Sequence, residues 1–313
     1  MNDKIAAHFS KPLVTKYRYE RLRHCDKCGS FTSLRGPVCS SCKRSGTLKP
    51  LARIGAGKAR FRTAVEALLL TAAAISAVYL SPNAVQRTAT ALLGAGLLVG
   101  YGLLLRRYSG IFAPYRLHRL LVEKSPQIAD GLDADEKAAE ADYEADRYRE
   151  CYEKLREVGV FVLEDRIRYN KIICLGRFVL RKDMDLELES VVPRKYSKLF
   201  VHYMWEVSKV NRTLIREKSL DYALRFRSDI EKLSYGTELL TNVASAALRS
   251  KTNLSACEYL IGDYAIALPR DRFIRLCGML SNARWEYPNL TARVAQIAES
   301  RYAHDPEVQA LIR

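Results

Sequence analysis

The sequence predicts a mostly α-helical membrane protein, with a small cysteine-rich domain before two membrane helices and a larger helical region after them. Three observations predict this fold class. Two cysteine pairs lie within residues 25–42, two apolar segments occupy residues 64–80 and 88–105, and apolar residues recur at three-and-four spacing from about residue 150. With 48% hydrophobic and 27% charged residues among 313, the chain has the composition of folded protein and room for two or three units.

Four of the eight cysteines have the spacing of metal ligands, C-x2-C, ten residues, C-x2-C: Cys25, Cys28, Cys39 and Cys42. A two-residue gap lets a tight turn aim both sulfurs at one Zn²⁺ ion at ~2.3 Å, and two such turns complete a tetrahedron. Gly29 follows the first pair and Gly46 lies shortly after the second, where a turn favours positive φ. The remaining cysteines are scattered and are predicted to be buried apolar side chains: Cys151, Cys174, Cys257 and Cys277.

The C-x2-C-G and C-x2-C halves of residues 23–46 resemble the zinc-ribbon superfamily, and the resemblance does not extend to the rest of the chain. A closed shell of four thiolates leaves no position for a reactive water, so the predicted Zn²⁺ is structural. A redox dithiol, a disulfide pair, or His24 as a substitute ligand are the alternatives. We expect residues 30–37 to form one short hairpin between the cysteine pairs.

Each apolar segment is at the short end of what crosses a ~30 Å hydrocarbon core. Lysines and arginines flank the outer ends of the two segments, at residues 58, 60 and 62 and at 106, 107, 116 and 119, whereas Arg87 stands alone between them. This asymmetry predicts both termini in the cytosol, at a plasma membrane or a bacterial inner membrane. Ser81 and Pro82 are expected to cap and begin the second helix. A buried soluble hairpin is the alternative.

Small residues recur at four-residue spacing within the segments, as Ala73/Ala77 and Gly96/Gly100. This spacing favours close helix packing, either within the hairpin or between protomers of a homo-oligomer. Glu66 lies one turn from Arg62, so its carboxylate either reaches the membrane interface or marks an ion path.

Positive charge is concentrated in residues 1–62, where 15 lysines and arginines face three acids and supply 12 of the net 16 positive charges. Such charge orients a membrane protein and attracts phosphates, whether of anionic lipid headgroups or of nucleic acid. Tyr17, Tyr19 and Phe31 would be available to stack on bases. The basic residues around the cysteines are Lys16, Arg18, Arg21, Arg23, Lys27, Arg35, Lys43 and Arg44.

The chain is therefore divided into six segments: a basic zinc ribbon (1–50), a linker (51–63), a two-span hairpin (64–107), an interfacial segment (108–128), an acidic helical stalk with a solvated face (129–158) and an α-helical cytosolic domain (159–313). Membrane insertion of the interfacial segment would use Ile111, Phe112, Tyr115 and Leu120. In the last domain, helices are expected at 237–249, 254–268, 270–283 and 289–303, in a solenoid-like series. Residues 160–163 and 172–180 could be helix or strand.

No catalytic motif is evident, so we expect a protein that is not an enzyme. The Gly-Ala-Gly-Lys sequence at 55–58 lacks the first glycine and the Ser/Thr of a phosphate-binding loop, and neither H-E-x-x-H nor G-x-S-x-G occurs. The leading hypothesis is a membrane-anchored scaffold that presents the ribbon and the helical domain to a cytosolic protein partner. Two alternatives are a membrane tether for nucleic acid and a two-span effector that assembles and perturbs the bilayer on sensing a signal.

Overall fold

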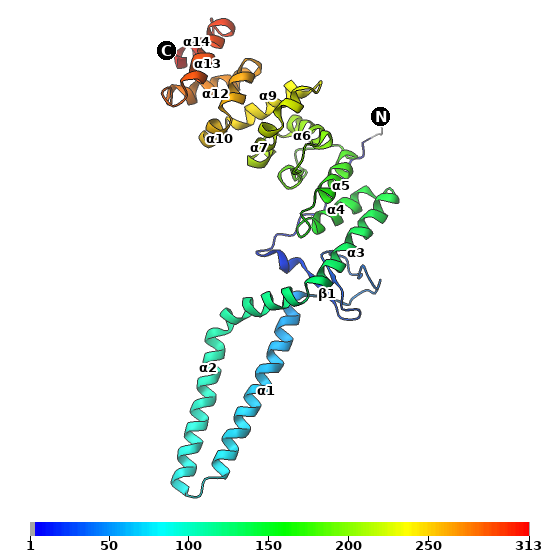
Figure 1. Ribbon diagram of the computed structural model, residues 1–313, viewed down its shortest axis with the longest axis vertical. Helices are drawn as coiled ribbons and strands as arrows, with labels where there is room; N and C mark the ends of the chain where they lie inside the picture. The colour runs from blue at the N-terminus through cyan, green and yellow to red at the C-terminus, as the bar shows by residue number, and fades with distance from the viewer. Residues whose placement is uncertain (1–3, 313) are drawn as a thin grey trace. The chain divides into compact units, whose positions relative to one another are not determined.

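The computed structural model describes residues 4–312, apart from the side chains of residues 52–60 and 108–117. It is 66% helical and forms two compact units. The hairpin unit is Pro12–Ala141, and the helical unit combines Met1–Lys11 with Asp142–Arg313 (Figure 1). The predicted membrane contacts of Ile111, Phe112 and Tyr115, the basic flanks Lys58, Arg60 and Arg116, and the 55–58 motif lie outside the described side chains.

The hairpin unit begins with a 3₁₀ turn, η1 (Arg18–Arg21), and a three-stranded antiparallel sheet in the order β2-β1-β3. The strands are β1 (Arg23–Cys25), β2 (Phe31–Thr32) and β3 (Leu48–Pro50), and His24 pairs with both Phe31 and Lys49. The hairpin predicted within residues 30–37 is therefore wrong. Residues 31–32 pair with the preceding strand, β1, because the turn at the first cysteine pair already reverses the chain between these two strands.

Two long helices follow the sheet: α1 (Leu51–Tyr79) and α2 (Ala84–Glu123). Helix α1 begins directly after β3, so residues 51–63 are helix and not the predicted linker. Asn83 precedes the first residue of α2, which corrects the cap predicted at Ser81. Ser81 instead stays with the first helix, because its hydroxyl donates to the carbonyl oxygen of Ala77 at 2.8 Å.

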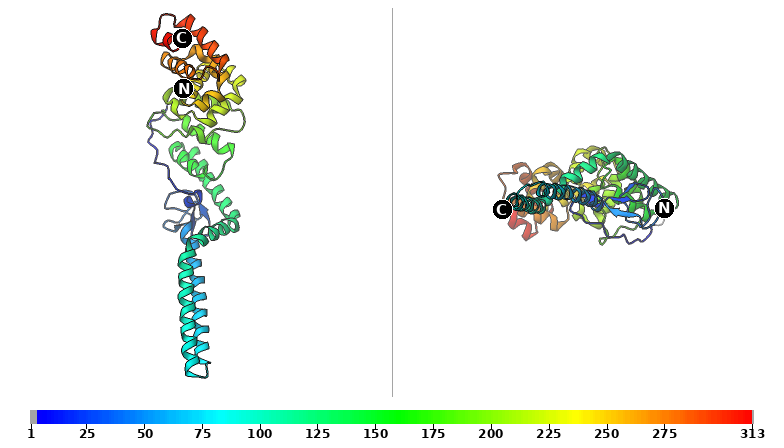
Figure 2. Two further views of the ribbon diagram at one scale, coloured as in Figure 1. Left: turned by 90° about the vertical axis from the view of Figure 1, so that its left-hand side faces the viewer. Right: turned by 90° about the horizontal axis from the view of Figure 1, so that it is seen from below.

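Helices α1 and α2 pack side by side as an antiparallel hairpin (Figures 1 and 2). Among the described glycines of α2, the closest approach is at Gly94, where an added Cβ would lie 3.0 Å from the Cβ of Ala74. The predicted small-residue pairs are not at this contact: Ala73 and Ala77 are exposed, and a Cβ on Gly96 or Gly100 would meet nothing within 4 Å.

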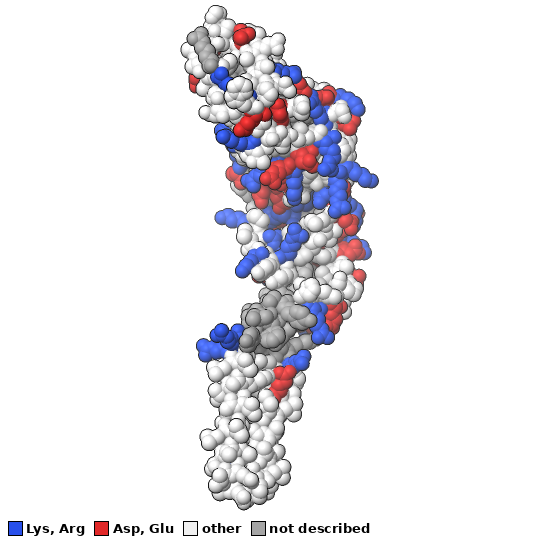
Figure 3. Space-filling model, turned by 60° about the vertical axis from the view of Figure 1, so that its left-hand side comes forward, with Lys and Arg blue, Asp and Glu red and all other residues white. Residues whose placement is uncertain are grey.

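The hairpin surface is apolar along most of its length, and Figure 3 shows charged side chains at one end of it. The segments Phe61–Tyr79 and Ala84–Arg107 are long and apolar enough to cross a membrane. Of the two apolar windows, 0% and 6% are buried within the protein, which is unlike the core helices of a soluble fold. At the charged end, Glu66 accepts from Arg62 Nε at 2.9 Å and from Tyr101 Oη at 2.7 Å.

The acidic run after the hairpin forms α3 (Ser125–Glu144), but it is not a uniformly solvated stalk. Asp135, Glu136 and Asp142 are all buried. The helix ends at Glu144, a left-handed residue follows at Asp146, whose φ is 57°, and α4 (Tyr148–Val158) is a separate helix. The sequence prediction failed here because composition gives the average exposure of a run, whereas packing selects individual carboxylates.

The first residues of the chain belong to the helical unit and not to the ribbon domain predicted for residues 1–50. The Ile5 amide donates to the carbonyl of Arg177 at 2.9 Å, and the Val179 amide donates to the carbonyl of Ile5 at 3.0 Å. The Phe9 ring packs on Tyr152 and Phe178, with ring centroids 4.6 and 5.3 Å away. A backbone bridge and an aromatic anchor thus attach this segment.

The helical unit is a series of helices in which each contacts its neighbours, through the pairs α4–α5, α5–α6, α6–α9, α9–α11, α11–α13 and α13–α14. Such nearest-neighbour packing is typical of solenoids. After α4 the α-helices are α5 (Asp165–Gly176), α6 (Lys198–Val210), α7 (Glu217–Arg225), α8 (Arg227–Glu231), α9 (Gly236–Ala247), α10 (Lys251–Ala256), α11 (Glu258–Tyr264), α12 (Arg270–Ser281), α13 (Pro288–Arg301) and α14 (Pro306–Ile312).

Three of the four helices predicted by position are single helices, whereas the one expected at 254–268 is broken at Cys257. The open question at 172–180 is resolved in favour of helix up to Gly176, and Phe178 makes only an isolated bridge to Ile5. Cys151, Cys174, Cys257 and Cys277 are buried, as predicted.

Candidate metal centre

Two cysteine pairs, separated by ten residues along the chain, meet at one point in the hairpin unit. The sulfur atoms of Cys25, Cys28, Cys39 and Cys42 all lie within 4.8 Å of one another. Cys25 and Cys42 are 3.7 Å apart, as are Cys28 and Cys39. A tetrahedron of sulfurs ~2.3 Å from a central ion has edges of ~3.8 Å, so these separations fit one four-coordinate metal ion. A disulfide requires ~2.05 Å and does not fit.

Two similar turns bring the sulfurs together. The amide of Gly29 donates to the carbonyl of Cys25, and the amide of Lys43 donates to the carbonyl of Cys39, both at 2.9 Å. The residue after each cysteine pair is left-handed, with φ of 74° at Gly29 and 57° at Lys43. Glycine takes this conformation without strain, as predicted for the first turn, whereas the second turn imposes it on a lysine.

Hydroxyl groups and backbone amides surround the sulfurs. Thr47 Oγ1 lies 3.1 Å from the sulfur of Cys25, and Ser30 Oγ lies 3.0 Å from that of Cys28. Burial raises the pKa of the Cys25 thiol, but hydrogen bonds from Thr47 and backbone amides outweigh it and lower the pKa to about 6. The environment therefore favours a thiolate, the form of cysteine that binds metal.

The four thiols also compete with one another for negative charge. A hydrogen bond from the Arg44 amide lowers the pKa of Cys42. Burial and the other three cysteines have the larger, opposite effect, so the pKa is raised to about 11. Four neighbouring thiolates repel one another, and a dication at their centre removes that repulsion. His24 is not one of the clustered ligands, because its Nδ1 lies 3.7 Å from Asp26 Oδ1 and its ring packs on Phe31.

The loop between the cysteine pairs is held by one buried carboxylate from α3. Asp135 accepts hydrogen bonds from Thr32 Oγ1 at 2.7 Å, from the Ser33 amide at 2.7 Å and from Ser40 Oγ at 2.6 Å. The Ser33 hydroxyl donates to it as well, at 3.0 Å. Because Ser40 lies between Cys39 and Cys42, Asp135 connects the helix after the hairpin to the cysteine turns before it.

A glycine one turn earlier in α3 allows this close approach. A Cβ built on Gly131 would lie 2.0 Å from the carbonyl oxygen of Phe31, so no other residue fits without moving the helix from β2. Sequence reasoning missed Gly131 and Asp135. Their spacing of four residues places both on one face of α3, but nothing local to residues 131–135 indicates which segment that face contacts.

Gly131→Ala is expected to loosen α3 from β2, because the added methyl group overlaps backbone that cannot rotate away. Protease cleavage within residues 30–45 of the purified full chain should become several-fold faster. Gly278→Ala in α12 is the control, because a Cβ there meets nothing within 4 Å. Equal cleavage of the two variants would contradict a tight α3–β2 contact.

The basic surface near the cysteines differs from the predicted nucleic-acid site. Phe31 is only 3% exposed, so it is not available to stack on bases, which corrects that prediction. The rings of Tyr17 and Tyr19 stack on each other, with centroids 5.3 Å apart. Arg23 donates to the carbonyls of Arg35 and Gly36 at 3.0 and 3.4 Å, so its guanidinium supports the loop.

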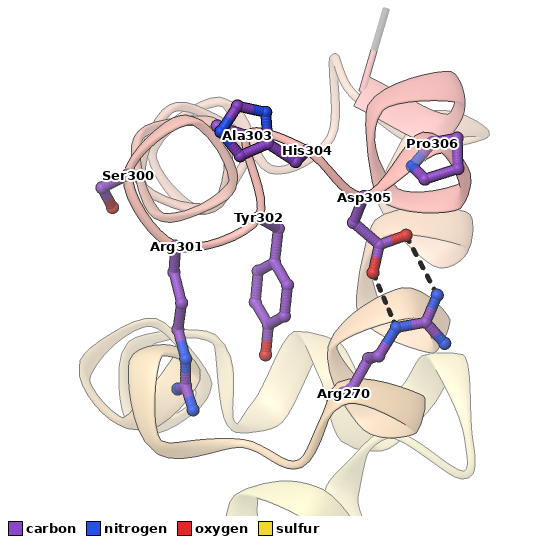
Figure 4. A pocket seen from close by; sticks show the side chains of 8 residues that line it. All are labelled: Arg270, Ser300, Arg301, Tyr302, Ala303, His304, Asp305 and Pro306. Atoms are coloured by element: carbon purple, nitrogen blue, oxygen red, sulfur yellow. Dashed lines mark hydrogen bonds and ion pairs between the residues drawn. The ribbon is translucent and has the colours of Figure 1, made fainter.

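A pocket of about 490 Å³ lies in the helical unit, between the start of α12 and residues 300–306 (Figure 4). Two arginines line it: Arg301 donates to the Ile266 carbonyl, and Arg270 is bound by both oxygens of Asp305, at 2.6 and 3.0 Å, and by Glu307 at 3.0 Å. The pocket therefore offers no uncompensated charge from Arg270 to a ligand. Comparison of the chain with family models, with curated proteins and with solved structures gives no match.

Proposed function

We propose that the chain is a membrane-anchored scaffold whose cysteine cluster holds a structural Zn²⁺ and whose helical unit binds a cytosolic protein. The contact of Asp135 with Thr32, Ser33 and Ser40 is the observation that carries this proposal. It joins the segment before α1 to the segment after α2. If the hairpin spans a membrane, both of its flanks must then lie on the same side.

The charge distribution supports the cytosolic side. Among the described side chains next to the spans, Arg62, Arg106 and Arg107 lie on the flanks and Arg87 lies near the turn. Arg87 is also engaged locally, because its Nε donates to the Ser81 carbonyl at 2.9 Å. Flanks rich in arginine favour the cytosol. Four thiolates with two-residue gaps favour Zn²⁺ over harder metals.

The scaffold proposal predicts a protein partner that depends on the helical unit. The full chain is cross-linked to its partners, solubilised in detergent, treated with nuclease and purified. The same bound protein should be recovered in each repeat of the experiment. A control comprising residues 12–141 keeps the hairpin unit and should lose that protein. Retention of the same protein by the control, or loss of all bound material on nuclease treatment, would contradict the scaffold.

The nucleic-acid tether has less support, because Phe31 is buried and Arg23 supports the loop. We expect the full chain to bind DNA and RNA weakly and to lose that binding steeply between about 50 and 200 mM salt. Tyr17→Ala/Tyr19→Ala should leave the affinity nearly unchanged, since charge attraction needs no aromatic ring. Tight binding at the higher salt that the double variant abolishes would favour the tether.

The effector alternative requires hairpins to associate. Ala73, Ala77 and Gly96 are exposed on the hairpin and face away from the α1–α2 contact at Gly94, so they are accessible to a second hairpin.

Anionic lipid headgroups remain proposed ligands of the basic segment before α1, where η1 contacts the start of that helix.

A further inference from the structure

Four arginines lie around the C-terminal end of α9 in the helical unit. Arg216 immediately precedes α7, Arg249 follows α9, and Arg272 and Arg275 lie in the first turns of α12. Arg249 Nη2 donates to the carbonyl of Ile215, the residue before Arg216. Arg275, one turn after Arg272, donates from Nη2 to the Arg249 carbonyl at 3.4 Å. Their charges act on one another: burial lowers the pKa of Arg249, and repulsion from Arg272, Arg216 and Arg275 lowers it further. Like charges this close destabilise the fold unless another group compensates them.

Two of these guanidinium groups are fixed by backbone carbonyls and not by carboxylates. Arg249 donates from Nε to the Ala246 carbonyl at 3.0 Å and from Nη2 to the Arg212 carbonyl at 2.9 Å. Arg275 donates from Nε to the Leu248 carbonyl at 2.8 Å. These bonds add side-chain donors to carbonyls at the end of α9 and in the turn before α7. They orient the guanidinium groups but leave both full charges in place, because a carbonyl is neutral.

Capping of α9 does not account for the other two arginines. The Nε of Arg272 is buried and makes no hydrogen bond among the described residues, and its ion pair is with the adjacent Asp271 at 3.3 Å. Glu189 is also close, but its carboxylate accepts from the amides of Arg216, Lys218 and Ser219 at 3.0–3.1 Å. It therefore caps the N-terminus of α7, and together with Asp271 it brings two negative charges to the four positive charges of the arginines.

We propose that Arg216, Arg249, Arg272 and Arg275 form a binding site for a phosphate dianion. A guanidinium group matches the oxygens of phosphate through two parallel hydrogen bonds, and a dianion relieves the repulsion among four neighbouring cations. The group could belong to a free phosphate compound or to a phosphorylated side chain of the protein partner. The site lies in the unit assigned to partner binding, but it does not depend on the metal centre or on membrane insertion.

Titration of the detergent-solubilised full chain tests the site with two probes, inorganic pyrophosphate and a phosphoserine peptide beside its unphosphorylated form. At least one phosphate probe should bind, and Arg216→Gln/Arg272→Gln should weaken it by about tenfold or more. This variant leaves the carbonyl bonds of Arg249 and Arg275 intact. Pyrophosphate binding alone identifies a small-molecule site, and preference for the phosphopeptide identifies a protein ligand.

Arg225→Gln/Arg293→Gln is the matched control. It removes the same charge from the same unit, at residues that pair with Asp221 and Asp263, at 3.0 and 2.7 Å. Arg216→Lys/Arg272→Lys keeps the charge, loses the planar fork and should bind with intermediate affinity. Failure of both probes to bind the wild-type chain, or equal weakening in the Gln variant and the control, would overturn the site.

Discussion

Replacing both Cys25 and Cys28 by serine should abolish stoichiometric metal binding and unfold the small sheet around them. The wild-type chain is expected to carry one Zn²⁺, because its four sulfurs already lie at the separations of a tetrahedral site. Binding of structural zinc is worth ~10–16 kcal/mol in small domains, far more than a three-stranded sheet of this size provides alone. The double variant loses half of the ligands.

Elemental analysis of the purified chain measures the metal, and protease sensitivity of residues 23–50 measures the fold. Cys257→Ala is the control, since it removes a buried cysteine from the helical unit and leaves the cluster untouched. Equal zinc in the wild type and the double variant would end the zinc-ribbon interpretation.

Asp135→Ala is expected to detach α3 from the cysteine loop. The carboxylate is fully buried and accepts from two serines and a threonine, so its removal leaves several donors without an acceptor. Each such donor costs ~1–3 kcal/mol, and we expect a loss of about 3–5 kcal/mol in the stability of this part of the unit. Amide hydrogen exchange at Ser33 should accelerate accordingly, because that amide loses its acceptor.

Asp133→Ala is the matched control for this prediction. Asp133 lies two residues away on α3, is exposed, and pairs with Lys137 at 2.8 Å on the surface. Its replacement should change exchange at Ser33 little, since exposed ion pairs contribute little. Asp135→Asn keeps the size of the side chain, and its rate of amide exchange at Ser33 should lie between those of Asp135→Ala and Asp133→Ala. Unchanged exchange in Asp135→Ala would show that the loop does not depend on α3.

The sequence predicted best those features that depend on neighbouring residues. The cysteine cluster follows from two C-x2-C turns, and Gly29 follows from the positive φ that the first turn requires. The apolar hairpin and most helices of the last domain were also predictable, because breakers and periodicity are local signals. The Ser81 cap shows the limit of such signals, since Ser81 bonds back to α1 instead.

Contacts between distant residues could not be predicted in this way. Asp135 meets Thr32 across about 100 residues, and within an acidic run it is indistinguishable by composition from exposed Asp133. Phe9 likewise packs on Tyr152 and Phe178, which moves the first residues of the chain into the helical unit. Phe31 was expected to be available for stacking, but the close approach of Gly131 to its backbone places it in a core.

We propose that α1 and α2 span a membrane with both flanks on its cytosolic side, where Asp135 holds them together. A reporter active only in the cytosol, fused before residue 1, after residue 313, or within the turn at Pro82–Asn83, measures this directly. This topology predicts activity at both ends and none in the turn, with all three fusions in the membrane fraction. An active turn fusion, or a C-terminal fusion that is membrane-bound and inactive, would contradict it.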